Sequence, residues 1–288
     1  MDSNVNDIKN NSISPDSFPG GFTVLMAVYK NDDITLFKRA VQSVFENTLL
    51  PNAFVLVVDG QVPNPLGKII TSLESEYKLE TLHLPVNVGL AKALNAGLTK
   101  VRTKWVARAD ADDYNDPERF ALQANAIARS DNTIDIVGGA IQEIDVYGKP
   151  LAVRRTVENH SDIMRYASYR NPFNHMTVVY KTEFAIQNGG YPHIHLKEDY
   201  ALWAQMLSNG ARALNLPNIL VFATAGKEMY SRRGGLKYAT AEISLQRHLV
   251  RTGIKSLPMA IVHGISRATV FILPSFCRGW IYERFLRT

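Results

Sequence analysis

Short apolar runs alternate with stretches of helical periodicity in the first part of the chain. Residues 22–28 and 54–58 are continuous apolar runs of strand length, each followed by polar residues. Between them, apolar side chains recur every three or four residues, at Leu36, Phe37, Ala40, Val41, Val44 and Phe45. Further strands are predicted at 79–84 and from 105, and helices at 66–77 and 89–98. This order predicts βαβ units, and therefore an α/β fold with a mostly parallel sheet.

Beyond residue 120 the pattern is less regular. Partial alternation at 134–144 and a short run at 151–153, joined by a turn, predict strands of a more antiparallel half. Strands are also predicted at 177–180 and 219–223. Helices are predicted from residue 117, from residue 197 and over 236–251.

Three carboxylates, Asp110, Asp112 and Asp113, stand at the end of the fourth predicted strand. Open α/β sheets bind ligands at this edge, beyond the carboxyl ends of the strands. Because three acids within four residues repel one another, the cluster requires a compensating cation. Oxygen ligands suit Mg²⁺ or Mn²⁺, which bridge to substrate phosphates. The alternative is an ordinary polar turn, in which Asp116 caps the helix that follows Pro117.

Other candidate positions have plain structural alternatives. Asn87 and Asn95 flank the helix that begins at Gly89, whose free N–H groups could hold an anion or simply be capped. Glu198 and Asp199 fall in a first helical turn, where the helix dipole favours acids without any function.

His175 stands in a loop rich in Asn and Pro, and could be a core residue, a capping group or a substrate contact. Arg232 and Arg233 precede two glycines, a combination that suits close contact with a diphosphate.

Composition and charge narrow the partners. The 288 residues are 46% apolar and 20% charged, as in a globular protein. Residues 226–288 hold 11 Lys or Arg against 3 acids, so the basic charge is concentrated there. A basic, apolar tail suggests an anionic membrane surface or a phosphate-bearing substrate, whereas no nucleic-acid-binding signature is present. The single cysteine, Cys277, indicates a reducing compartment, and the polar first 21 residues are not those of a signal peptide.

The tail also contains a segment of 15 residues, 259–273, that is apolar apart from His263 and Arg267. As a helix it would reach roughly 22 Å, which is short of the roughly 30 Å hydrocarbon core of a bilayer. We expect peripheral attachment to the cytoplasmic face of the inner membrane, assisted by Arg278, Arg284 and Arg287. A helix packed on the catalytic domain is the alternative.

Taken in order, these motifs resemble the inverting GT-A glycosyltransferases of family 2, which build bacterial polysaccharides such as O-antigen. The resemblance covers roughly residues 22–250 and is carried by the segments 27–31, 57–59, 87–95, 109–120 and 198–200. It implies a GT-A domain with a nucleotide-binding half at 22–120 and an acceptor-binding half at 121–250. The expected flanking parts are a flexible leader at 1–21 and a helical, membrane-associating extension at 251–288.

The resemblance also implies roles for individual residues. Tyr29 and Asp59 would bind the nucleoside of a UDP-sugar, with Asp59 accepting a hydrogen bond from the uracil. Asp112 would be the direct metal ligand, and Asp110 would bind the ribose or complete the metal shell. Asp199 would be the general base and Glu198 its acidic neighbour. We also expect donor contacts from Asn87, Gly89, Asn95, Arg232 and Arg233, and acceptor contacts from His175 and Trp203.

The function expected from these roles is transfer of glucose or galactose from a UDP-sugar to a lipid-diphosphate-linked saccharide. Inversion would give a β bond, possibly β1,3 to an N-acetylhexosamine. Two alternatives stay open at this point. One is a sugar nucleotidyltransferase, although residues 29–33 lack the glycine such a loop needs. The other is a scaffold that binds UDP or lipid without turnover.

Overall fold

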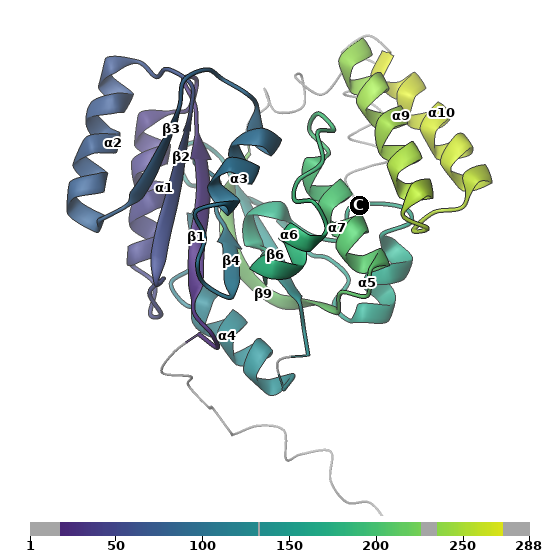
Figure 1. The fold of residues 1–288 in the computed structure, drawn as a ribbon, viewed down its shortest axis with the longest axis horizontal. Helices are drawn as coiled ribbons and strands as arrows, with labels where there is room; N and C mark the ends of the chain where they lie inside the picture. The colour runs from purple at the N-terminus through teal and green to yellow at the C-terminus, as the bar shows by residue number, and fades with distance from the viewer. Residues whose placement is uncertain (1–17, 132, 226–234, 273–288) are drawn as a thin grey trace, which may run out of the picture.

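The computed structural model describes residues 18–131, 133–225 and 235–272. Within these ranges the strands form one nine-stranded sheet in the order β3-β2-β1-β4-β8-β6-β9-β5, with β7 paired to β6. Helices cover both faces of the sheet (Figure 1). The predicted α/β class is therefore confirmed.

The first half alternates strands and helices as predicted. Strands β1, β2, β3 and β4 pair in parallel, with β1 between β2 and β4. The bounds are β1 Phe22–Val28, α1 Ile34–Phe45, β2 Ala53–Asp59, α2 Asn64–Tyr77, β3 Glu80–Leu84, α3 Leu90–Leu98 and β4 Trp105–Arg108.

The two faces of this sheet have separate cores because side chains alternate along each strand. Val24 and Met26 of β1 pack with α1 and α2, whereas Leu25 packs with α3. Helix α3 lies close to the sheet at Gly97, where a Cβ would come within 2.4 Å of the Leu25 side chain. The apolar runs are continuous because both faces are covered.

The second half is mixed. Strand β8 runs antiparallel to both β4 and β6, while β6 and β9 are parallel. The bounds are β5 Tyr114–Asn115, α4 Arg119–Arg129, β6 Ile136–Ile144, β7 Pro150–Arg154, α5 His160–Tyr166, η1 His175–Thr177, β8 Val179–Lys181, α6 Thr182–Gln187, α7 Glu198–Ser208 and β9 Ala213–Thr224.

Several predicted boundaries were wrong. Helix α4 begins at Arg119 rather than Pro117, because Asp116 and Pro117 lie in a turn closed by Arg119 N–H donating to Asp116 O at 3.0 Å. The strand expected at 177–180 starts later, since a short 3₁₀ helix occupies its first residue. Helices α5 and α6 were not predicted.

The core includes Phe18, which lies inside the segment expected to be a flexible leader. Phe18 is buried against Phe22, and Trp105 Nε1 donates to Pro19 O at 2.9 Å. Residues 1–17 lie outside the described part of the chain.

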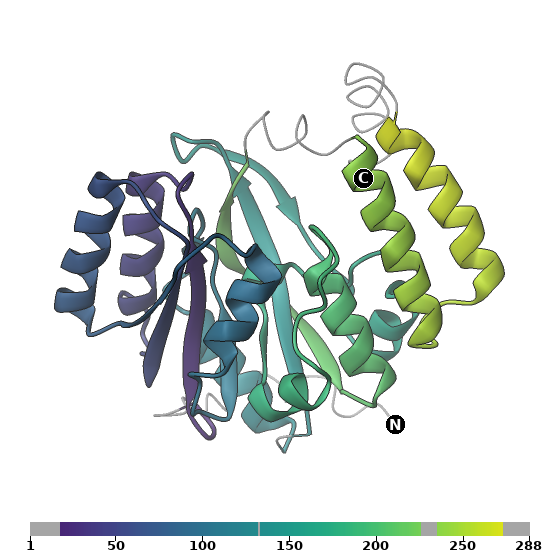
Figure 2. The same ribbon diagram turned by 45° about the horizontal axis from the view of Figure 1, so that its top comes forward.

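Helices α9 (Leu236–Arg251) and α10 (Leu257–Ile272) form a hairpin at the side of the molecule far from α1 and α2 (Figures 1 and 2). Gly235 precedes α9, and its N–H donates to Phe271 O in α10 at 2.9 Å. Among the described residues, every helix is too short or too polar to cross a bilayer.

Candidate active site

Arg108 is a buried cation at the end of β4, directly below the acid cluster. Its side chain is 1% exposed and forms an ion pair with Asp110. Its Nη1 donates to Leu25 O at 3.1 Å. The protein itself therefore supplies part of the positive charge that the acid cluster requires. The acids of this segment were identified from the sequence, but Arg108 was not.

A second guanidinium, Arg119, lies fully buried beneath the first. Its Nη2 donates to Arg108 O at 2.8 Å, and it also donates to Asn115 and Gln123. Burial, with the Arg108 charge as a further cause, lowers the pKa of Arg119 to about 9. The turn that carries the acids therefore rests on two hydrogen-bonded arginines.

Asp112 and Asp113 have different surroundings. Asp113 is buried, and its Oδ1 accepts a hydrogen bond from Thr224 N at 2.8 Å, which ties the turn to the end of β9. The Thr224 hydroxyl donates to Asp112 O at 2.7 Å, so the Asp112 carboxylate itself remains available. Burial raises the pKa of Asp112 to about 6, with repulsion from Asp110 as a further cause.

Asp32 is an acid of this site that the sequence reading did not single out. Its Oδ2 accepts a hydrogen bond from Tyr29 N at 2.8 Å. Burial, with the charges of Asp112 and Asp110 as further causes, raises the pKa of Asp32 to about 7. The sequence contained evidence for this position, since Asp32 follows the first strand and neighbouring parallel strands end at the same edge of a sheet.

The carboxylates of Asp110 and Asp112 suit a divalent cation that also contacts a substrate. Asp110 and Asp112 offer hard oxygen ligands, and repulsion between acids is what a cation would relieve. Among the described residues no cluster of His, Cys, Asp or Glu forms a complete metal site. Mg²⁺ and Mn²⁺ are commonly held by one or two carboxylates together with substrate phosphates.

Asp59, one of the two expected nucleoside-binding residues, lies in a hydrogen-bonded network between β2 and α3. Asp59 Oδ1 accepts from Val88 N at 2.7 Å, and its Oδ2 accepts from Gly89 N and Asn87 Nδ2 at 3.0 Å each. A Cβ on Gly60 would lie 2.5 Å from Asn87 N, so glycine permits this close approach. Asp59 thereby fixes the loop before α3.

Asn95 was expected to contact the sugar-nucleotide donor, but its side chain is bonded to the backbone of Tyr191. Its Nδ2 donates to Tyr191 O at 2.8 Å, and its Oδ1 accepts from Tyr191 N at 2.7 Å. These two bonds join α3 to the loop that leads toward α7.

The predicted acidic pair begins α7. Asn171 Nδ2 donates to Asp199 Oδ2 at 2.6 Å, and this bond engages only one of the two carboxylate oxygens. Glu198 is buried, and burial raises its pKa to about 7, with the Asp199 charge adding to the effect. The Arg108 charge acts on Glu198 in the opposite direction, so the pair lies within the field of the buried arginine.

His175 connects the two groups of acids. Burial lowers its pKa, and the Arg108 charge lowers it further. Asp199 and Asp110 both act on it in the opposite direction. Its Nε2 is buried and has no hydrogen-bond partner among the described residues. The fold therefore brings together residues from β4, the 171–175 loop and α7 that are far apart in sequence.

Trp203 lies below this site and not at its surface. It is fully buried, and its ring packs edge to face against Phe173, His175, Tyr180 and Tyr191. Trp203 therefore packs beneath His175 and stabilises the position of its ring. Arg232 and Arg233 lie outside the described residues.

With this geometry established, comparison with known proteins identifies the family. The family model described as glycosyl transferase family 2 matches residues 23–188. The match covers more than half of the chain and includes the acid cluster. The chain belongs to glycosyltransferase family 2.

Similarity to this family extends along nearly the whole chain. An Escherichia coli UDP-Gal:alpha-D-GlcNAc-diphosphoundecaprenol beta-1,3-galactosyltransferase is 34% identical over 266 residues, which are 92% of this chain and 96% of that protein. S. aureus TarS in complex with UDP-GlcNAc has a TM-score of 0.63 at 16% identity, over 93% of this chain and 76% of that one. A Pyrobaculum calidifontis mannosyltransferase in complex with GDP-Man and Mn²⁺ has a TM-score of 0.56 at 16% identity, over 90% and 82%. These similarities confirm the GT-A fold.

Glu198→Gln is expected to change how the stability of this family 2 protein depends on pH. Because the folded state raises the pKa of Glu198, the wild-type free energy of unfolding falls as the pH rises from the ordinary value of 4.5 to about 7. The variant lacks this loss. Its stability relative to wild type should therefore grow by roughly 1 to 3 kcal/mol between about pH 4 and about pH 8. Urea unfolding at both pH values measures the change, and a constant difference would contradict the raised pKa.

Proposed function

We propose that this protein is an inverting galactosyltransferase. It moves galactose from UDP-galactose to an N-acetylhexosamine carried on a lipid diphosphate and forms a β1,3 bond. The observation that carries this proposal is the similarity, over 92% of the chain, to the E. coli enzyme whose name states that reaction. Family membership favours glycosyl transfer over the nucleotidyltransferase alternative.

The donor binds across the carboxyl ends of β1, β2 and β4. Tyr29 and Asp59 stand at the ends of the first two of these strands, and Asp110 and Asp112 follow the third. Because the strands are parallel neighbours, their ends meet at one edge. A nucleoside against Tyr29 and Asp59 thus extends its diphosphate toward Asp112.

A divalent cation would be held by Asp112 and Asp110, and Mn²⁺ or Mg²⁺ suits these ligands. When bound, it stabilises the negative charge that develops on the leaving diphosphate. The solved mannosyltransferase with Mn²⁺ supports this choice.

Asp199 removes the proton from the acceptor. The acceptor oxygen forms a bond to the anomeric carbon, the bond from that carbon to the diphosphate oxygen breaks, and UDP leaves with the bonding electrons. The proton passes from the attacking hydroxyl to Asp199. Asn171 orients the carboxylate by its 2.6 Å hydrogen bond. Attack opposite the leaving group converts an α-linked donor into a β-linked product.

The proposal is tested with purified protein, Mn²⁺ and a synthetic GlcNAc-diphosphate lipid. UDP-galactose should give a disaccharide lipid with a β1,3 bond, and UDP-glucose should be used less well. Asp199→Asn should lower kcat by at least about 100-fold while UDP affinity and Tm stay unchanged, because a base acts only in the chemical step. Glu198→Gln is the control in the same helical turn. No transfer from any UDP-sugar would indicate a scaffold, and an active Asp199→Asn variant would make His175 the next candidate base.

Asp112→Asn should abolish turnover and weaken UDP binding only when Mn²⁺ or Mg²⁺ is present, because the carboxylate acts through the cation. Asp59→Asn is the matched control, since loss of a nucleoside contact should weaken UDP binding both with and without metal. Calorimetry with Mn²⁺ and with EDTA measures both variants. Full wild-type activity in EDTA would contradict metal dependence.

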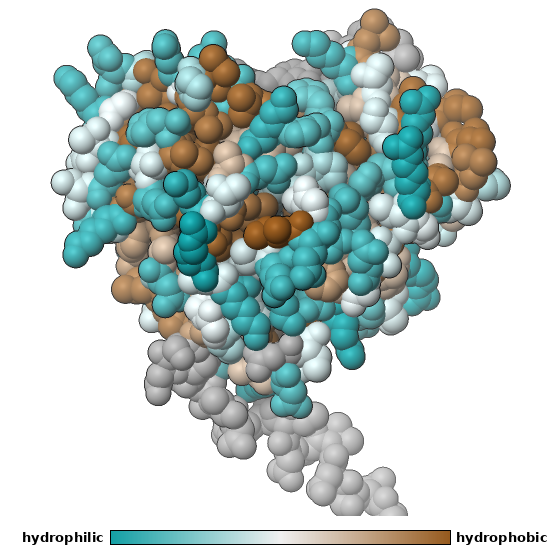
Figure 3. Space-filling model, in the orientation of Figure 1, coloured by the Kyte–Doolittle hydropathy of each residue, from teal (hydrophilic) through white to brown (hydrophobic). Residues whose placement is uncertain are grey.

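We also propose that the protein attaches peripherally to the cytoplasmic face of the inner membrane through α10. Leu257, Ile261, Val262 and Ile265 are each more than half exposed, and apolar side chains gather over this side of the hairpin (Figure 3). Apolar side chains presented by a helix surface can enter the boundary between headgroups and acyl chains. The lipid-linked acceptor would be available at that surface.

High salt or carbonate should release the membrane-bound pool. Val262→Glu with Ile265→Glu should reduce that pool, because charged residues oppose burial among acyl chains. Ile186→Glu, which alters an exposed apolar residue of α6, is the control and should not. Fractionation followed by immunoblotting measures the distribution. Resistance to both salt and carbonate would show deeper insertion than proposed.

A further inference from the structure

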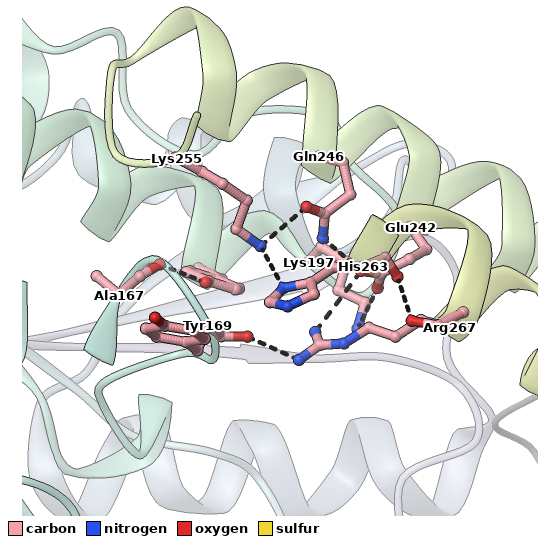
Figure 4. Close-up of polar contacts among 10 residues, drawn as sticks. Ala167, Tyr169, Lys197, Glu242, Gln246, Lys255, His263 and Arg267 are labelled. Carbon is pink, nitrogen blue, oxygen red and sulfur yellow. Dashed lines mark hydrogen bonds and ion pairs between the residues drawn. The ribbon is translucent and has the colours of Figure 1, made fainter. Parts of the chain in front are cut away.

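A buried carboxylate, Glu242, lies at the centre of a charged network between α9 and the catalytic part of the chain (Figure 4). Its Oε2 lies 3.4 Å from Lys197 Nζ, and its Oε1 lies 3.6 Å from Arg267 Nη1. Gln246 Nε2 donates to the same Oε1 at 2.7 Å. Removing one partner from a buried ion pair leaves an uncompensated charge, so these groups strongly constrain one another.

Both cations of this network lead to the proposed base. Lys197 immediately precedes Glu198 and Asp199, and its O accepts the first helical hydrogen bond, from Ala201 N at 3.0 Å. The Lys197 ammonium also lies 5.7 Å from the Phe271 ring centroid at the end of α10. Through Lys197, the hairpin therefore holds the start of α7.

The second connection runs through Arg267 in α10. Its Nη2 donates to Tyr169 O at 2.6 Å. Tyr169 is two residues before Asn171, whose side chain donates to Asp199. Tyr200 strengthens the same junction by donating its hydroxyl to Ala167 O. The backbone that carries Asp199 and the backbone that carries its hydrogen-bond donor are thus both linked to Glu242.

A neighbouring set of contacts stays within the hairpin. Lys255 Nζ donates to Gln246 Oε1 at 2.9 Å and lies 3.3 Å from His263 Nδ1. Lys255 is buried like Glu242 but lies in the turn between α9 and α10, and neither of these two contacts is made to the 167–171 loop or to the start of α7 itself. Its link to that loop is indirect, since the His263 ring packs 5.8 Å from the Tyr169 ring. Lys255 therefore offers a control for loss of a buried charge that is not directly paired with Glu242.

We propose that Glu242 is a positioning residue for the Asp199 carboxylate: it holds Lys197 and Arg267, and through them α7 and the Asn171 loop, in the geometry needed for proton removal. This inference rests on the proposed role of Asp199. Its physical basis is that a displacement of about 1 Å at a reacting group can lower the rate by on the order of 100-fold, although the displaced group is chemically intact.

The test compares Glu242→Gln, Lys197→Gln and Lys255→Gln in the full chain. Glu242→Gln and Lys197→Gln should each lower kcat by about 10-fold to 100-fold. Their KM for the UDP-sugar should stay within about 2-fold, because the nucleotide is proposed to bind at the carboxyl ends of β1 and β2 and not at Glu242 or Lys197. The double variant should be scarcely worse than Glu242→Gln alone, since Lys197 acts through its ion pair with Glu242. Lys197→Arg should restore activity because it keeps the cation.

Lys255→Gln separates positioning from general stability. It should lower Tm by an amount similar to Glu242→Gln but leave kcat within about 2-fold of wild type. An equal loss of kcat in Lys255→Gln, or wild-type kcat in a folded Glu242→Gln, would overturn the inference. If Glu242→Gln fails to fold, Lys197→Gln and its rescue by Lys197→Arg decide the question.

Hydrogen exchange provides a readout that does not depend on catalysis. Amides of residues 169–171 and 197–201 should exchange faster in Lys197→Gln than in wild type, while those of the 87–89 loop should not change. Unchanged exchange in the first two segments would overturn the positioning role. If the wild-type protein shows no sugar transfer while Lys197→Gln shows this exchange pattern, the proposed function is refuted. The structural link between Glu242 and the two segments would still be established.

Discussion

The site depends on one physical constraint, a guanidinium buried at the end of the fourth strand. Arg108 is 1% exposed, and a charge at such a depth must be paired and hydrogen-bonded. It meets this need with Asp110 and with a carbonyl of β1. Its positive charge also reduces the repulsion between Asp110 and Asp112, so that these acids can lie close together at the sheet edge. Its field reaches Glu198 and His175 as well, so the acid cluster and the start of α7 share one buried cation.

Polar side chains, and not only apolar packing, join the two halves around this cation. Asn95 exchanges two hydrogen bonds with the backbone of Tyr191, and Asp113 holds the end of β9 through Thr224. Within the second half, Gln123 donates to Val137 O at 3.1 Å and to Thr177 O at 2.8 Å. Such bonds have directional requirements, so they set the position of the second half more closely than apolar contact does.

The α9–α10 hairpin combines an apolar outer surface with a charged inner one. Ile261 and Ile265 are exposed on α10, whereas Arg267 of the same helix reaches inward to Tyr169 and Glu242. The two expectations for this segment, membrane contact and packing on the catalytic domain, are therefore compatible, because they concern different sides of one helix. The inner side of α10 reaches the rest of the chain through the hydrogen bond from Arg267 to Tyr169 O, and the outer side is the proposed membrane contact.

The sequence alone determined the order of the first strands and helices and the place of the acids, because buried parallel strands leave continuous apolar runs whose ends are visible. It did not reveal Arg108, since an arginine after an apolar run looks like any surface residue until its depth is known. Nor did it reveal Asp32, Asn171 or Glu242, whose partners lie far away in sequence. Helices α5 and α6 were missed because they are short and depend on tertiary packing. Only the tertiary structure could decide these points, because burial and long-range pairing are properties of the packed chain and not of its local pattern.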